Sequence, residues 1–542
     1  MCADAGEARW FPDRPVAWFE HDDADVRVPP APSPLQGLDQ TLIIRDALAN
    51  EVERVLALEG RRPAQDVNAA DEVPCSTWFC ARNHLRPMTP EEVVAGPSAI
   101  APTLPLRIIK GKDSGASLGF QVIDAVGRKF MLKFDPAPNL GLMTSGEIIG
   151  ARIFFAAGYH TLNTFLVSVP RRDLLLDPRA TFNLYGVQKR PLSQARVDAV
   201  LARVARNPDG SIRAVAVPWA PGKVLGGFDM IGRRSDDPND RIPHEDRRSL
   251  RADWVLYSWL SVFDASAVNT LESYVEEDGR RFVRHYHFDF GCSFGSATVS
   301  PQPPRSDGER TVEVGRSLAA FFSLGFYRRP FQTIRSEWES LTRRYPTIGY
   351  YPAETFDPDS HRTNRKVPAH MRLTDRDAYW GAKLVTSFSD AQLDALVAAA
   401  HLSDDAAAYL AHAMKVRRDI IGRRYLRGFA AVEDPRVSDG GGEVCFRDLA
   451  IERGYATVAT RYVYEITDGH GFAVTSGEHT SSGAWSCLPL GGVGRGTGYR
   501  ILRIAARLDG REGAAVTKAS RVHLRWREAE RRFVVVGLER DE

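Results

Sequence analysis

The sequence predicts an α+β fold in which a two-lobed core lies between an N-terminal extension and a C-terminal antiparallel β domain. The chain has 542 residues, which is enough for several domains. From about residue 105 the apolar residues alternate as in strands, and over 312–427 they mostly recur at helical spacing. After about residue 428, short alternating segments separated by glycine clusters indicate an antiparallel sheet. We therefore expect boundaries near 1–104, 105–220, 221–427 and 428–542.

Composition excludes several classes of protein. Hydrophobic residues make up 43% of the chain and charged residues 26%, which is typical of a globular protein. Lys and Arg together number 71 against 69 Asp and Glu, so the net charge of +2 gives no support for nucleic-acid binding. No stretch approaches 18 consecutive apolar residues, so no transmembrane segment is expected.

The N-terminal extension begins with an acidic, Pro-rich strap over 1–38, and helical spacing predicts a helix over 39–60. If the chain is complete as given, it is expected to be cytoplasmic. If Cys2 is instead the mature N-terminus, the protein is expected to be a cell-envelope lipoprotein. The six cysteines form no CxxC pairs, which excludes the usual zinc spacings. Cys75 and Cys80 are close enough to pair in an exported protein, although spacing alone does not establish the bond.

In the first lobe, two strands join at a turn around Val126, and this register places Lys133 opposite Gly119. Glycines allow backbone amides to approach phosphate oxygens, and a lysine neutralises their charge, so we expect a phosphate site here. The expected binding residues are Lys112, Gly115, Gly119 and Lys133.

A helix is predicted over Thr144–Gly158, where Glu147 is the natural partner of Lys133. The alternative is a capping box, in which Thr144 is the N-cap and Glu147 binds the backbone at the helix start.

The second lobe contains a buried helix over 249–263, followed by the D-x-x-x-x-N spacing of Asp264 and Asn269. A hairpin comes next, and its Asp278-Gly279 turn pairs Glu277 with Arg280. Carried outward, this register puts Asn269 opposite Phe288, next to Asp289 of the D-F-G tripeptide. Two oxygen ligands for a metal ion would then meet at one point.

This order of elements resembles the protein-kinase-like fold. The stretches KGKDSGASLGF, SGEIIGARIFFAAGY and RHYHFDFG, with EVPCSTWF at 72–79, resemble an uncharacterised group of bacterial kinase-fold proteins, distantly similar to HipA-type and CotH-type kinases. The resemblance implies an ATP- and Mg²⁺-dependent phosphotransferase acting on an unknown hydroxyl acceptor. In such an enzyme Lys133, oriented by Glu147, would bind the phosphates of ATP. Asn269 and Asp289 would bind Mg²⁺, and Asp264 would accept the proton of the acceptor hydroxyl.

The chain departs from the kinase patterns around Asp264. Val262 and Phe263 stand where eukaryotic-type kinases have His-Arg, and Ala265 and Ser266 stand where HipA-type enzymes have Arg-His. A nucleotide-binding pseudokinase or scaffold is therefore an alternative, since a fold does not fix a function. Adenylyl transfer to the acceptor also stays open.

A serine hydrolase is a further alternative. G-C-S-F-G at 291–295 matches the G-x-S-x-G nucleophile elbow, with Ser293 as nucleophile. The elbow requires a helix directly after the serine, and the prolines at 301, 303 and 304 argue against one. His285 and His287 alternate on one strand face, where histidines are more often structural than metal-binding.

Overall fold

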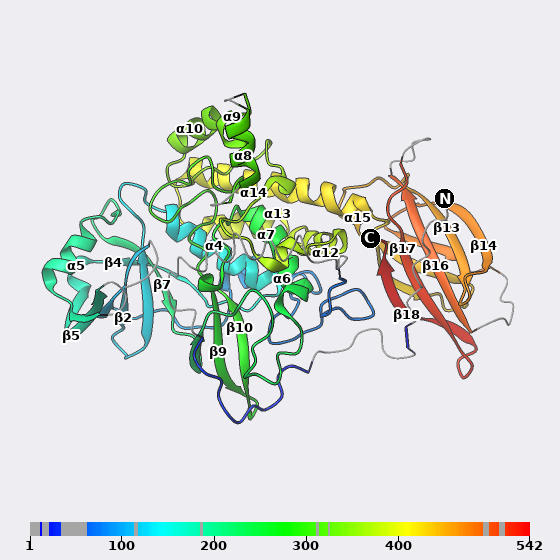
Figure 1. The fold of residues 1–542 in the computed structure, drawn as a ribbon, viewed down its shortest axis with the longest axis horizontal. Helices are drawn as coiled ribbons and strands as arrows, with labels where there is room; N and C mark the ends of the chain where they lie inside the picture. The colour runs from blue at the N-terminus through cyan, green and yellow to red at the C-terminus, as the bar shows by residue number, and fades with distance from the viewer. Residues whose placement is uncertain are drawn as a thin grey trace.

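The computed structural model describes residues 11–12, 21–33, 62–112, 117–184, 188–310, 314–323, 326–491, 498–508 and 515–542. The expected helix over 39–60, Cys2 and Gly115 lie outside these residues. In Figure 1 a large sheet and the C-terminal strands occupy opposite ends of the molecule, with the helices between them. The predicted α+β class, with a C-terminal antiparallel β part, is confirmed. No helix in the described ranges has the length and apolar character needed to cross a membrane.

The first lobe is built on a seven-stranded sheet in the order β4-β7-β3-β2-β1-β5-β6. Neighbouring strands are antiparallel except β1 and β5, which run parallel. The strands are β1 Leu106–Gly111, β2 Leu118–Ile123, β3 Lys129–Phe134, β4 Phe165–Val169, β5 Leu174–Leu184, β6 Gln188–Pro191 and β7 Ile212–Pro218.

Two helices accompany this sheet. Helix α5 (Gln194–Leu201) lies in the stretch after residue 105 where alternation predicts strands, and it packs Val197 and Leu201 into the sheet's hydrophobic core. Helix α4 (Leu142–Ala157) contacts β3 and β7 and leads into the helical lobe. It begins two residues before the predicted start.

The second lobe is mainly helical and shares one large core with residues 73–93 of the N-terminal extension. The helix predicted over 249–263 is two helices, α6 and α7, because the chain turns at Ala252. A three-stranded antiparallel sheet, β10-β9-β8, flanks them. The elements are α3 Pro90–Ala95, β8 Lys223–Gly226, α6 Arg248–Arg251, α7 Asp253–Leu260, β9 Thr270–Glu277, β10 Arg280–His287, α8 Val314–Phe322, α9 Pro330–Thr333, α10 Arg335–Arg344, α11 Pro368–Met371, α12 Asp375–Val385, α13 Asp390–Ala398 and α14 Asp404–Tyr425.

The C-terminal part contains two antiparallel sheets, β11-β12-β15 and β14-β13-β16-β17-β18, whose apolar side chains form a single core. A disulfide joins Cys445 and Cys487, which face each other on β12 and β15. The elements are β11 Val432–Val437, β12 Glu443–Asp448, α15 Leu449–Glu452, β13 Arg461–Asp468, β14 Ala473–Thr480, β15 Trp485–Pro489, β16 Tyr499–Arg507, β17 Ser520–Arg527 and β18 Arg532–Arg540.

A buried cluster of charges joins the N-terminal extension, the helical lobe and the C-terminal sheets. Arg540 of β18 pairs with Asp71 and with Glu433, at 2.7 Å from the latter. Asp71 also binds Arg248 of α6 at 2.7 Å, and Lys383 of α12 binds Glu433 at 2.6 Å. Charges taken out of water are tolerated only when they are paired and hydrogen-bonded. In this cluster, which we call the junction, each buried charge therefore depends on partners from the other parts of the chain.

We predict that Arg540→Ala lowers the free energy of unfolding by about 3–5 kcal/mol, because it leaves Asp71 and Glu433 buried without this cation. Equilibrium urea unfolding, followed by tryptophan fluorescence, measures the change. The matched control is Arg503→Ala, since Arg503 is half-exposed and pairs with Asp541 at the surface. That substitution should cost less than about 1 kcal/mol. Equal costs for the two variants would contradict the role assigned to the junction.

Candidate active site

Lys133 lies on β3 in the register that the sequence predicts, directly opposite Gly119 of β2. The site needs a glycine at 119, because a Cβ there would lie 2.3 Å from the carbonyl oxygen of Leu132. The Lys133 side chain is 1% exposed, so its ammonium group requires buried partners.

Asp135, two residues after Lys133, fixes the start of α4. Its carboxylate accepts hydrogen bonds from the backbone of Gly141, Met143 and Thr144, at 2.8–2.9 Å, and from the Thr144 hydroxyl. These bonds satisfy amide groups that a helix start leaves without partners. The capping-box alternative is therefore wrong: Thr144 lies inside the helix, and Glu147 is free to bind elsewhere.

Glu147 and Asp289 are the two partners of Lys133. Lys133 forms a short ion pair with Glu147 and lies 3.0 Å from Asp289 Oδ1.

These contacts change the pKa values of all three groups. Burial alone would lower the pKa of Lys133, but the carboxylates of Asp289 and Glu147 outweigh the effect of burial and raise this pKa. Burial also disfavours ionised Asp289, yet Lys133 and Lys112 hold its pKa well below the usual range. Burial raises the pKa of Glu147 to about 7. Asp289 is thus the carboxylate that stays ionised, as a metal ligand must.

The D-F-G segment packs closely against α4 at two glycines of the helix. A Cβ at Gly146 would lie 2.9 Å from the Phe290 carbonyl oxygen, and one at Gly150 would lie 2.7 Å from the Phe290 Cβ. The Phe290 amide also donates to Glu147 at 3.3 Å. Asp289 itself has φ of 62°, a left-handed conformation that costs energy in a residue other than glycine. In the sequence this contact corresponds to the G-x-x-x-G spacing in SGEIIGA, which places both glycines on one face of the helix. Only the structure shows that Phe290 packs against that face.

The hairpin has the predicted register from Glu277–Arg280 outward, and the Phe288 amide donates to the Asn269 carbonyl at 3.1 Å. Asn269 thereby lies across from the residue before Asp289. Its side-chain nitrogen donates to the Asp264 carbonyl, which leaves its side-chain oxygen for another partner. Together with the Asp289 carboxylate, this oxygen belongs to the donor set that Mg²⁺ prefers. The residues present therefore fit a bound Mg²⁺.

Lys112 directly follows β1. Its ammonium group donates to the hydroxyl and, at 3.2 Å, to the carbonyl of Ser117, which directly precedes β2. Burial and then the charge of Lys133 lower the pKa of Lys112 to about 8. A second lysine therefore stands beside Lys133 with a pKa near neutrality.

The alternative sites have structural roles here. Ser293 is fully buried and donates to the Phe290 carbonyl at 2.8 Å. The described residues directly after it, 294–310, form no helix, whereas a nucleophile elbow requires one there. His285 stacks on Trp78 with ring centroids 3.5 Å apart, and His287 lies 3.2 Å from the Tyr257 hydroxyl. Both histidines are buried in the core and form no metal cluster among the described residues.

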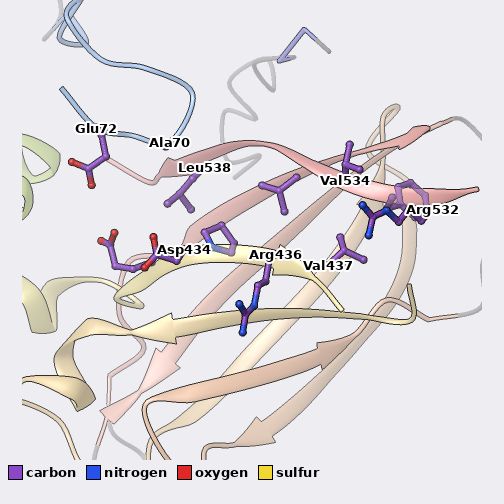
Figure 2. Close-up of a pocket in the computed structure, with 12 residues that line it drawn as sticks. Ala70, Glu72, Asp434, Arg436, Val437, Arg532, Val534 and Leu538 are labelled. Atoms are coloured by element: carbon purple, nitrogen blue, oxygen red, sulfur yellow. The ribbon is translucent and has the colours of Figure 1, made fainter. Parts of the chain in front are cut away.

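Figure 2 shows a cavity elsewhere, between β11 and β18 of the C-terminal sheets, with a volume of about 400 Å³. Glu72 and Asp434 lie at one end of the cavity, near Leu538, and Arg532 lies at the other end, near Val437 and Val534. None of the residues that the sequence singles out for catalysis lines it. The cavity is therefore separate from the site around Lys133.

Comparison with known proteins finds only distant similarities. Neither a protein-family model nor a curated protein sequence matches this chain. Among solved structures, a Helicobacter pylori proinflammatory kinase, CtkA, matches at 12% identity and a TM-score of 0.29, over 60% of this chain and 95% of that one. A Golgi casein kinase with Mn/ADP bound matches at 12% identity and a TM-score of 0.23, over 53% of this chain and 74% of that one. Another structure of the Golgi casein kinase matches at 11% identity and the same TM-score, over 69% of this chain and 96% of that one.

Proposed function

We propose that this protein is a kinase-like phosphotransferase that uses ATP and Mg²⁺ to phosphorylate a hydroxyl group. The observation that carries the proposal is the buried Lys133 held between Glu147 and Asp289. A lysine so paired presents a fixed positive charge to phosphate oxygens, while Asp289 stays ionised for a metal ion. Neither the buried lysine nor the ionised aspartate is needed to stabilise β3. An apolar side chain at position 133 would pack there without the free-energy cost of burying a charge.

Each residue has a role in the proposed reaction. Lys133 and Lys112 bind phosphate oxygens, and Asn269 and Asp289 hold Mg²⁺, which neutralises charge on the phosphates when bound. Asp264 accepts the proton of the acceptor hydroxyl as that oxygen forms its bond to the γ-phosphorus. The bond between the γ-phosphorus and the bridging oxygen breaks, and its electron pair leaves with ADP. Gly119, and Gly115 as predicted from the sequence, give the backbone close approach to the phosphates.

We further propose that the protein functions in an oxidising compartment. The structure contains two disulfides, Cys75–Cys80 and Cys445–Cys487, and only Cys292 is free among the described cysteines. Disulfides persist mainly in exported proteins. This supports the cell-envelope alternative over the cytoplasmic one.

We predict that ATP with Mg²⁺ raises the melting temperature of the protein and that Asp289→Ala abolishes this shift, because the variant loses a metal ligand and a partner of Lys133. Thermal shift with ATP and Mg²⁺, together and separately, measures it. Asp405→Ala, an exposed carboxylate on α14, is the control and should keep the full shift.

The remaining outcomes decide between the candidate functions. An undiminished shift in Asp289→Ala would overturn the metal assignment. Absence of any shift in the wild type would overturn nucleotide binding and favour a scaffold.

We predict that ATP affinity falls as the pH rises from about 8 to 9.5, because Lys112 loses its proton there and must regain it to bind phosphate. Lys133, whose pKa is raised, stays charged over this range. In Lys112→Arg the charge is permanent, so affinity should become independent of pH over this range. Lys112→Met should bind ATP more weakly at pH 7.5 and show no such dependence. Calorimetric titration with Mg-ATP measures both, and an unchanged pH slope in Lys112→Arg would contradict the assignment.

We predict that protein isolated from its native cell under alkylating, non-reducing conditions yields peptides linked through Cys445–Cys487 and through Cys75–Cys80. Mass spectrometry detects the links. Cys292, which is buried beside Thr298, should react with the alkylating reagent only after denaturation. Recovery of all four paired cysteines as free alkylated thiols would refute the proposed compartment.

A further inference from the structure

The residues directly before and after Asp264 are apolar, and the hydroxyl of Ser266 is buried without a hydrogen-bond partner among the described residues, so none of these neighbours orients the Asp264 carboxylate. Val262 and Ala265 are buried apolar residues of the helical lobe's core, and the residue directly before the aspartate is Phe263. A general base must nevertheless be held within hydrogen-bond reach of the proton that it accepts. The group that orients Asp264 must therefore come from a distant part of the chain.

Asn364, 100 residues further along, binds Asp264 directly. Its side-chain nitrogen donates to Asp264 Oδ1 at 2.6 Å, and its backbone amide donates to the Phe263 carbonyl at 2.7 Å. One residue thus binds two consecutive residues of the catalytic loop, which fixes both the backbone and the carboxylate.

The orientation of the Asn364 amide follows from its partner. A carboxylate only accepts hydrogen bonds, so the amide nitrogen must face it, and the reversed amide would bring two oxygens together. The Asn364 oxygen is consequently buried without a partner among the described residues. Leaving a buried acceptor without a hydrogen bond costs free energy. This cost indicates that the hydrogen bond from the Asn364 nitrogen to Asp264 is what fixes the position of the side chain.

The loop that carries Asn364 is itself anchored. His361 is buried and its Nδ1 forms a short hydrogen bond with the Asp307 carboxylate, and the Arg362 amide donates to the Asp307 carbonyl at 2.7 Å. Asp307 belongs to the segment that follows the D-F-G tripeptide. Asn364 is therefore held rigidly, and its loop joins that segment to the residue proposed as base.

We propose that Asn364 is a positioning residue for Asp264, taking the place of the polar residues that flank this aspartate in other kinases. The inference rests on the proposed phosphotransferase function. Asn364 occupies Oδ1 and so leaves Oδ2 as the oxygen that accepts the acceptor's proton. A neutral amide donor fixes the direction of the Asp264 carboxylate without adding a positive charge next to the proposed metal site.

The test compares the wild type with Asn364→Asp and Asn364→Ala, using ADP release from Mg-ATP with water or the protein's own hydroxyls as acceptors. The aspartate variant keeps the shape of the side chain and removes the donor. We expect kcat to fall about 10- to 100-fold in both variants, with KM for ATP within about twofold of the wild type. A change confined to kcat, with the KM for ATP kept, would show that the substitution acts on the proton-accepting step and not on nucleotide binding.

Asn207→Ala is the matched control, since Asn207 is also half-buried and donates two side-chain hydrogen bonds, to Ser168 and Ser211, in the first lobe. It should leave kcat and the KM for ATP unchanged. Wild-type kcat in Asn364→Asp would overturn the role of Asn364 alone. Wild-type protein that releases no ADP would overturn the proposed function and, with it, this role. Circular dichroism and the melting temperature confirm that each variant is folded.

Discussion

The buried ammonium group of Lys133 is the constraint on which the candidate active site depends. A charge removed from water is stable only beside opposite charges, and its two carboxylate partners come from different elements, α4 and the segment after β10. The sheet, the helix and the D-F-G segment must therefore all be in place before the lysine is satisfied. Asp135 supports this arrangement, because it fixes where α4 begins and so where Glu147 lies.

A second buried cluster, around Arg540 and Asp71, holds the rest of the molecule together in the same way. It ties the N-terminal extension and the C-terminal sheets to the helical lobe. Lys383 of this cluster also binds Glu72, which lines the cavity between β11 and β18. The C-terminal sheets are thus attached through paired charges to helices α6 and α12, next to α7, which is followed by the segment that contains Asp264.

Local patterns predicted much of the site, and long-range pairing explains what they missed. The Asp278-Gly279 turn and the turn at Val126 set registers that placed Asn269 beside Phe288 and Lys133 opposite Gly119, because in a hairpin every pair follows from the turn. The role of Glu147 stayed ambiguous in sequence, since T-x-x-E fits a cap equally well until Asp135 is seen to fill that role. No local pattern links Asn364 to Asp264, because tertiary packing decides that contact. Helix α5 has a local signal in Ser193, whose hydroxyl caps it by accepting from the Arg196 amide.

The pairing of Asp71 with Arg540 spans 469 residues of sequence. During synthesis, the acidic side chain emerges from the ribosome long before its arginine, so the N-terminal extension cannot reach its final packing until β18 has been made. Contacts of such high sequence separation slow folding and prolong the exposure of unfinished apolar surface. The architecture therefore makes late packing of the N-terminal extension a condition of reaching the native state.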